Sequence, residues 1–63
     1  MEYSEPYFKI GDLVNVITNY KETVVGTGIY MGLDAYEMNV KVLLDSSELK
    51  EFDLTFYYLE KLN

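Results

Sequence analysis

One β-patterned segment, residues 23–33, carries three of the chain's four glycines, and this feature constrains the fold most. With a period of two, the segment has two faces: Gly26, Gly28, Tyr30 and Gly32 on one, and Val25, Thr27, Ile29, Met31 and Leu33 on the other. Glycine weakens a strand interior, so it usually marks a bulge, a barrel corner or the close approach of another backbone. The segment therefore predicts one long strand that bends strongly enough to serve two sides of a small barrel.

Four shorter β-patterned segments accompany this long one, and turn-forming residues separate them. They are residues 13–18, 39–45, 49–52 and 57–62. Within 39–52, alternation points Val40, Val42, Leu44 and Phe52 inward and Lys41 and Leu43 outward. Residues 53–56 are expected to form a single helical turn, with Asp53 as its cap and Leu54 plugging the end of the barrel.

Five short strands with regular turns predict an all-β fold, and at 63 residues a small five-stranded barrel is the economical arrangement. Closure of a barrel leaves few exposed strand edges. We expect an N-terminal arm over residues 1–8 and one barrel domain over residues 9–63. A domain this short has a thin core, so self-association is a further expectation.

The order of short motifs resembles the SH3-like small barrels of Tudor and KOW type. The motifs are Gly-Asp-Leu-Val-x-Val at 11–16, Gly-x-Gly-Ile-Tyr at 26–30, Val-Lys-Val-Leu-Leu-Asp at 40–45, Lys-Glu-Phe at 50–52 and Leu-Glu-Lys-Leu at 59–62. The resemblance covers residues 9–62 and implies a bent second strand and a short helical turn before the last strand. The chain is also similar to the short single-domain SH3-like barrel proteins of tailed bacteriophages, which share its Lys/Glu/Asn/Tyr-rich composition.

Two departures narrow what this resemblance implies. Peptide-binding SH3 domains carry an Ala-Leu-Tyr-Asp-Tyr-like stretch and a groove tryptophan, whereas this chain has no such stretch and no tryptophan. Recognition of proline motifs is therefore not expected. KOW-type barrels that bind RNA or ribosomal surfaces tend to be basic, and this chain is acidic.

The chain lacks the residue types on which most catalytic sites depend. It has no cysteine and no histidine, which excludes disulfides, thiolate nucleophiles and imidazole bases and argues against structural zinc. Its acids lack the alternate spacing of a calcium loop. Gly26-Thr27-Gly28 lies inside an apolar strand and not at the start of a helix, so it is not expected to bind phosphate. We expect no enzyme activity, no cofactor and no bound metal.

The charge balance favours a basic protein partner. Eleven acids face five lysines, for a formal net charge of −6, and this balance repels nucleic-acid backbones. Nucleic acid is therefore a poor candidate partner. The acidic N-terminal residues do not resemble a signal peptide, and no apolar run is long enough for a membrane. The expected location is the cytoplasm, which would be the host cytoplasm or the virion if the protein is viral.

Aromatic residues exceed what a small core can hold. Seven tyrosines and three phenylalanines make up 16% of the chain, so several rings should reach the surface, and alternation turns neighbours such as Tyr57 and Tyr58 to opposite sides. Tyrosine is enriched at interface hot spots. The alternative is that these tyrosines only border a thin core, with their hydroxyls in water. The candidate partner-binding residues are Tyr20, Tyr30, Tyr36, Phe56, Tyr57, Asp34 and Glu37.

These observations favour a non-catalytic protein-binding module, phage-encoded, with an accessory, assembly or host-modulating role. The alternative is a nucleic-acid-linked regulator that binds nucleic acid directly or imitates it with its acidic surface. A Tudor-like cage for a methylated side chain, built from Tyr20, Tyr30 and Tyr36, is a further interpretation.

Overall fold

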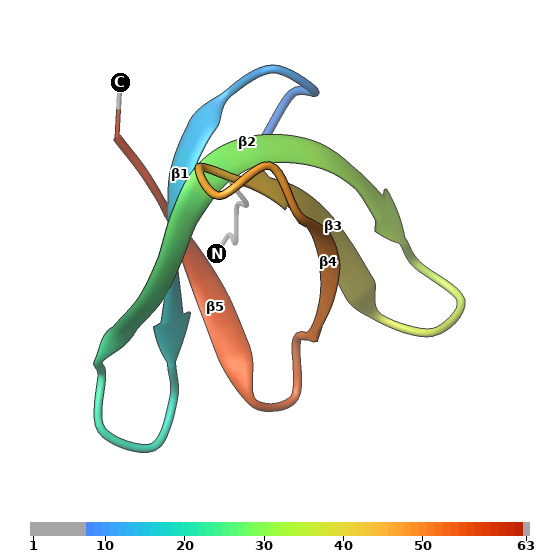
Figure 1. Cartoon of the computed structure of the whole chain (residues 1–63). Coiled ribbons are helices and arrows are strands. Elements are labelled where there is room, and N and C mark those ends of the chain that lie inside the picture. The colour runs from blue at the N-terminus through green and yellow to red at the C-terminus, as the bar shows by residue number, and fades with distance from the viewer. Residues whose placement is uncertain (1–7, 63) are drawn as a thin grey trace.

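The computed structural model describes residues 8–62, which form one antiparallel sheet of five strands (Figure 1). The strands are β1 (Leu13–Thr18), β2 (Val24–Asp34), β3 (Asn39–Leu44), β4 (Leu49–Asp53) and β5 (Tyr57–Lys61). All five lie close to their predicted positions, because β-branched alternation and turn residues mark each one locally. The described residues contain no helix, and hence none that could cross a membrane.

The strand order is β4-β3-β2-β1-β5, and every neighbouring pair is antiparallel. Within residues 8–62, β4 and β5 do not pair with each other, so the sheet is not closed and the prediction of a closed barrel is wrong in this respect. β5 pairs along its whole length with β1, from Val14 opposite Lys61 to Thr18 opposite Tyr57, and its other edge pairs with no strand among the described residues. Figure 1 shows β5 separated from β4 on the other side of the curled sheet.

The predicted bend of β2 is confirmed, and Figure 1 shows this strand arching over the molecule. The β2–β3 register shifts between Tyr30 and Gly32, and Gly32 has a φ of +134°, in the region that favours glycine. This bulge also resets the alternation of side chains. Leu33 therefore pairs with the inward-facing Val40, and its predicted position on the face opposite the glycines is wrong.

The core lies on the inner side of the curled sheet and is formed by Val14, Val16, Tyr30, Val40, Val42 and Phe52. The predicted inward positions of Val40, Val42 and Phe52 are confirmed, Leu44 is half-buried against the core, and Lys41 and Leu43 point outward. Phe8, assigned to the arm from sequence, packs on Tyr30 with their ring centroids 5.5 Å apart. The remainder of the predicted arm, residues 1–7, lies outside the described residues.

Residues 54–56 form a hydrogen-bonded turn, and the structure does not show the helical turn predicted over 53–56. The Asp53 carboxylate accepts a hydrogen bond from the Thr55 amide at 2.8 Å, and the Asp53 carbonyl accepts one from the Phe56 amide at 3.0 Å. Only one bond of the i to i+3 type forms before the chain enters β5. Leu54 is half-buried against the core, where it covers one end of the inner side.

Candidate functional site

Hydrogen bonds join three turns, of which two lie at opposite ends of β2 and the third lies between them. They connect β1 to β2, β2 to β3, and β4 to β5 (Figure 1). The Asn19 amide donates to the Phe56 carbonyl at 2.9 Å, which ties the first turn to the third. The Leu54 amide donates to the Met38 carbonyl, also at 2.9 Å, which ties the third turn to the second. The β4–β5 turn therefore holds the other two in place.

Each of the three turns carries one exposed aromatic ring. Tyr36 is 95% exposed, Tyr20 is 85% exposed and Phe56 is 61% exposed. Lys21 lies over the Tyr20 ring, with its Nζ 5.6 Å from the ring centroid. The expectation that surplus aromatic residues reach the surface is confirmed for these three positions.

The turn sequences themselves hold the aromatic residues in exposed positions. The Asp34 carboxylate accepts hydrogen bonds from the backbone amides of Tyr36, at 3.1 Å, and Glu37, at 3.3 Å. The Thr18 hydroxyl accepts one from the Tyr20 amide at 3.0 Å. Such bonds are typical of Asp and Thr in turns, and they fix the backbone on which each ring is carried.

The three turns carry an excess of negative charge. Four carboxylates lie in or directly beside the turns and face a single lysine, Lys21; the carboxylates belong to Glu22, Asp34, Glu37 and Asp53. We call Tyr20, Tyr36 and Phe56, together with these four acids, the turn surface. Five of the predicted partner-binding residues belong to it, with Tyr20 on a turn at one end of β2 and Asp34, Tyr36 and Glu37 at the other, and with Phe56 on the β4–β5 turn.

Two predicted residues do not belong to the turn surface. Tyr30 is only 7% exposed and packs against Phe8, so its predicted place on the surface is wrong, and burial raises the pKa of its hydroxyl. A cage built from Tyr20, Tyr30 and Tyr36 is therefore not formed. Tyr57 is half-buried against Phe52, with ring centroids 5.2 Å apart, while Tyr58 is 41% exposed, as alternation predicts.

An apolar groove of about 270 Å³ lies on the inner side of the sheet next to β5. Its walls come from Phe8, β2, β3, the β4–β5 turn and β5; the lining residues are Phe8, Tyr30, Leu33, Val40, Leu54, Tyr58 and Leu59. We call this feature the inner groove. Sequence reasoning missed it, because a closed barrel would be filled by its own side chains.

A second feature missed from sequence is a row of apolar residues across four strands on the outer face. Leu13 pairs with Ile29, Ile29 with Leu43, and Leu43 with Leu49. Period-two alternation along each strand could have identified these residues, but their alignment into a row depends on the register between neighbouring strands.

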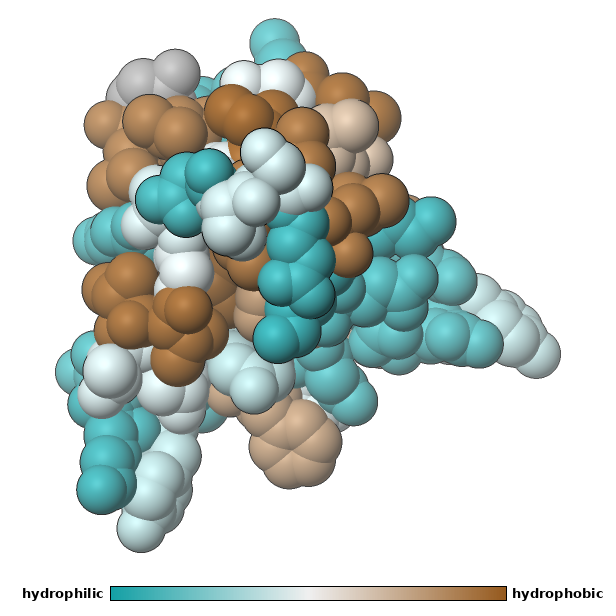
Figure 2. Space-filling view, in the orientation of Figure 1, coloured by the Kyte–Doolittle hydropathy of each residue, from teal (hydrophilic) through white to brown (hydrophobic). Residues whose placement is uncertain are grey.

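In Figure 2, brown hydrophobic residues gather in the upper and left part of the view, while the lower ends are mostly teal or pale.

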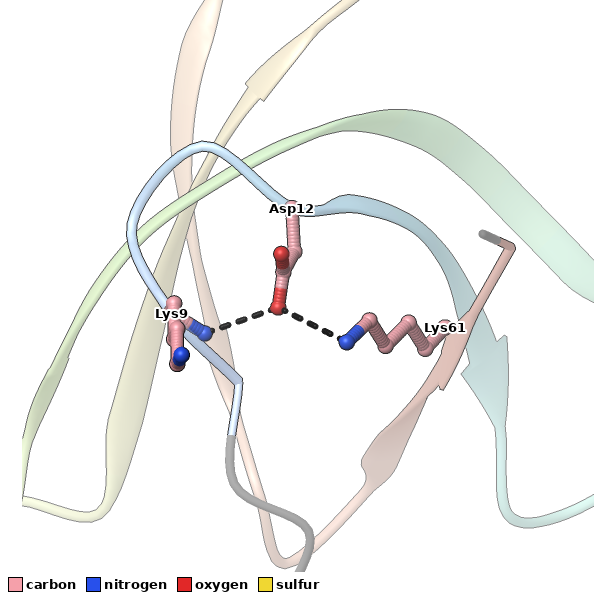
Figure 3. Close-up of polar contacts among 3 residues, drawn as sticks. All are labelled: Lys9, Asp12 and Lys61. Carbon is pink, nitrogen blue, oxygen red and sulfur yellow. Dashed lines mark hydrogen bonds and ion pairs between the residues drawn. The ribbon is translucent and has the colours of Figure 1, made fainter.

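Asp12 ties the start of the described chain to its last strand (Figure 3). Its carboxylate accepts a hydrogen bond from the Lys9 amide at 2.8 Å and lies 3.5 Å from the Lys61 Nζ. The Lys9 amide, and secondarily the positive charge of Lys61, lower the pKa of the Asp12 carboxyl below its ordinary value. The Asp12 carbonyl also accepts from the Tyr30 amide, so this cluster fastens residues 9–12 to β2 and β5 and has a structural role.

No group of three or more acidic side chains within residues 8–62 is arranged to hold a metal ion. Comparison with known proteins gives no relative from which a function could be transferred. No family model, no curated protein and no solved structure matches the chain.

Proposed function

We propose that this protein is a non-catalytic protein-binding module with an SH3-like small-barrel architecture, and that the turn surface is its binding site. The observation that carries the proposal is the presence of three exposed rings on three turns joined by hydrogen bonds. A partner would meet a preformed set of aromatic residues, because the turns are fixed by backbone bonds before binding.

The energetics of the turn surface support a contact with another protein. Burying one large apolar or aromatic side chain contributes about 1.5–3 kcal/mol, so two or three such rings support a specific complex. Tyrosine is enriched among the residues that dominate binding energy. The surrounding acids would steer a basic partner and disfavour an acidic one.

The sequence supports a non-catalytic role. The whole chain lacks histidine and cysteine, the side chains most often used as general bases and nucleophiles. Among the acids of the turn surface, Asp34 and Asp53 already accept hydrogen bonds from backbone amides of their own turns. These carboxylates serve the backbone and do not converge on a substrate.

The proposed biological setting is that of a phage-encoded accessory, assembly or host-modulating protein in the host cytoplasm or the virion. Its support is the similarity of this short chain, with its Lys/Glu/Asn/Tyr-rich composition, to the short single-domain SH3-like barrel proteins of tailed bacteriophages. The strongly bent, glycine-containing β2 agrees with that similarity.

The alternative is a nucleic-acid-linked regulator, and the structure favours the acidic-mimic form of it over direct binding. Lys9 and Lys61 both lie beside the Asp12 carboxylate (Figure 3), while Lys21, Lys41 and Lys50 lie on a turn, on β3 and on β4. Lysines on separate elements do not form the continuous basic patch that a phosphate backbone requires. An acidic mimic would instead use the carboxylates of the turn surface.

Capture from a bacterial lysate with matched variants tests the proposal. The immobilised protein is compared with a Tyr20→Ser/Tyr36→Ser/Phe56→Ser triple variant and with a Leu43→Ser/Leu49→Ser control, which removes exposed apolar residues elsewhere. We expect the wild-type protein and the control variant to capture at least one protein that the triple variant does not capture. Capture of that protein by the wild type should decrease as the salt concentration rises.

Equal capture by all three proteins, or no capture, would overturn the proposal. A mobility-shift assay with duplex DNA separates the alternative. A shift would indicate direct binding, and competition between DNA and this protein for one captured partner would indicate mimicry.

A further inference from the structure

We infer that the free edge of β5 is a docking site for an extended, basic segment of the partner protein, which adds a sixth strand beside the inner groove. This inference rests on the proposed function, because it assumes that the physiological ligand is a protein. This edge is a second contact, distinct from the turn surface, and the partner segment binds there as a β-strand.

The hydrogen-bond pattern identifies the backbone groups that face outward from β5. The Leu62 amide donates to the Leu13 carbonyl and the Phe56 carbonyl accepts from the Asn19 amide, so even-numbered residues of this stretch bond to β1. In an antiparallel ladder the intervening residues direct their amide and carbonyl groups to the other side. The groups of Tyr57, Leu59 and Lys61 therefore form the free edge, with no hydrogen-bond partner among residues 8–62.

The edge of β5 is less protected than the edge of β4. Proteins commonly guard edge strands with charged residues, which disfavour pairing with another chain. β4 carries charges on Lys50, Glu51 and Asp53, whereas the first three residues of β5 are uncharged. Strand addition is therefore easier at β5.

The inner groove provides pockets for the side chains of an added strand. Leu59 and Tyr58 of β5 form part of its wall, together with Leu54 from the adjoining turn. In strand addition, main-chain bonds to the edge provide affinity, and alternate side chains fill neighbouring pockets. A segment paired with β5 can therefore direct every second side chain into this apolar space.

Charge complementarity selects a basic segment. The net charge of the chain is −6, and Glu60 is exposed on β5 itself. The one lysine of β5, Lys61, is paired with Asp12 at 3.5 Å. The occupant should therefore alternate apolar residues with lysine or arginine, and an acidic segment should be rejected.

Amide hydrogen exchange by NMR tests the site, with a synthetic seven-residue peptide of alternating lysine and valine as probe. In the free protein, the amides of Tyr57, Leu59 and Lys61 should exchange rapidly, while those of Tyr58 and Glu60 should be protected by β1. At saturating peptide we expect protection of the first three to rise about tenfold or more, with Tyr58 and Glu60 already protected. A peptide of alternating glutamate and valine serves as the charge-reversed control and should leave exchange unchanged.

A Leu59→Pro variant removes one edge amide, and unchanged protection of Tyr58 and Glu60 would show that it still folds. It should no longer bind the peptide, and a Leu59→Val variant that keeps the amide should bind it.

The Tyr20→Ser/Tyr36→Ser/Phe56→Ser variant should bind the peptide normally, so failure of the β5 site and failure of the turn surface give different results. The inference is overturned if the peptide leaves the three edge amides unchanged. The inference is also overturned if the amides of Tyr57, Leu59 and Lys61 are protected in the free protein. Loss of that protection on deletion of residues 1–7 would then identify the chain's own N-terminal residues as the occupant. Loss of protection on dilution would identify a second copy of the chain.

Discussion

Gly28 of β2 and Leu43 of β3 lie so close together that no side chain fits between their backbones. A Cβ placed on Gly28 would overlap the Leu43 carbonyl oxygen and lie 2.7 Å from the Leu44 Cα. Both obstacles are backbone atoms of a strand that is paired on both of its sides. This contact explains why the long strand needs a glycine at position 28, and it makes the bent sheet testable by substitution.

Gly28→Ala should destabilise the fold severely. Overpacking usually costs about 1–3 kcal/mol, and a clash with backbone should reach or exceed the top of that range. A domain of this length has a total stability of about 3–9 kcal/mol, so much of the variant should be unfolded. Circular dichroism during urea unfolding measures the effect.

Gly26→Ala is the matched control for this substitution. A Cβ at position 26 would meet the Leu44 Cδ2 at 2.9 Å, which is the mobile end of a side chain. The expected cost is about 1 kcal/mol. Equal stability losses at positions 26 and 28 would contradict the close contact between β2 and β3.

Asp12→Asn should flatten the loss of stability in acid. The Lys9 amide and the charge of Lys61 lower the Asp12 pKa in the folded state below its ordinary value of 3.8. A carboxyl with a lowered folded pKa stabilises the fold above its unfolded pKa, and this contribution is lost as the pH falls through the folded value. Thermal unfolding should therefore show a smaller drop in Tm below about pH 4 for the variant than for the wild type. Parallel curves would show that the contacts of Asp12 do not contribute.

Tyr30→Phe should remove a tyrosine ionisation that occurs above the ordinary pKa of 10. Burial raises the pKa of the Tyr30 hydroxyl, so the folded state favours the neutral form. The stabilisation that this group gives to the fold is therefore fully present below the pKa of the unfolded state. It is lost as the pH rises through the pKa of the folded state. Titration followed by near-ultraviolet absorbance should lose its late step in the variant. A late step that persists would place the buried hydroxyl elsewhere.

Asp34→Ala and Tyr36→Ser should separate the support of the turn surface from its contact role. Asp34 accepts two backbone hydrogen bonds, so its removal should cost about 1 kcal/mol of stability and also weaken partner capture. Tyr36 is almost fully exposed, so its removal should change stability by no more than about 0.5 kcal/mol while weakening capture. Urea unfolding and quantitative capture of both variants test this pattern, and normal capture by Tyr36→Ser would contradict it.

Local sequence was sufficient to predict the five strands and the exposed aromatic residues of the turns. The β-branched residues of Leu13–Thr18 and the alternation from Val40 to Leu44 depend only on neighbours in the chain. Tyr20 and Tyr36 could be assigned to the surface because they lie among turn-forming residues. These features require no knowledge of which strands pair.

The non-local features could not be predicted in the same way. Leu33 changes face because of a bulge whose position depends on the register with β3. Tyr30 lies on the face of β2 that bears the glycines, which has less apolar side-chain surface than the opposite face. That face becomes the inner one because only glycine allows β3 to approach there. The open edge of β5, and with it the inner groove, follows from strand pairing that no local pattern encodes.

Site-specific photocrosslinking tests the binding role of the turn surface most directly. A photoreactive benzoylphenylalanine replaces Tyr36, Phe56 or, as a control on the outer face, Leu49, which is 58% exposed. After irradiation in a bacterial lysate, we expect positions 36 and 56 to give the same crosslinked protein, with the yield falling as salt rises. Position 49 should not give it. Crosslinks from position 49 alone, or none from positions 36 and 56, would contradict the proposal that this protein binds its partner through the turn surface.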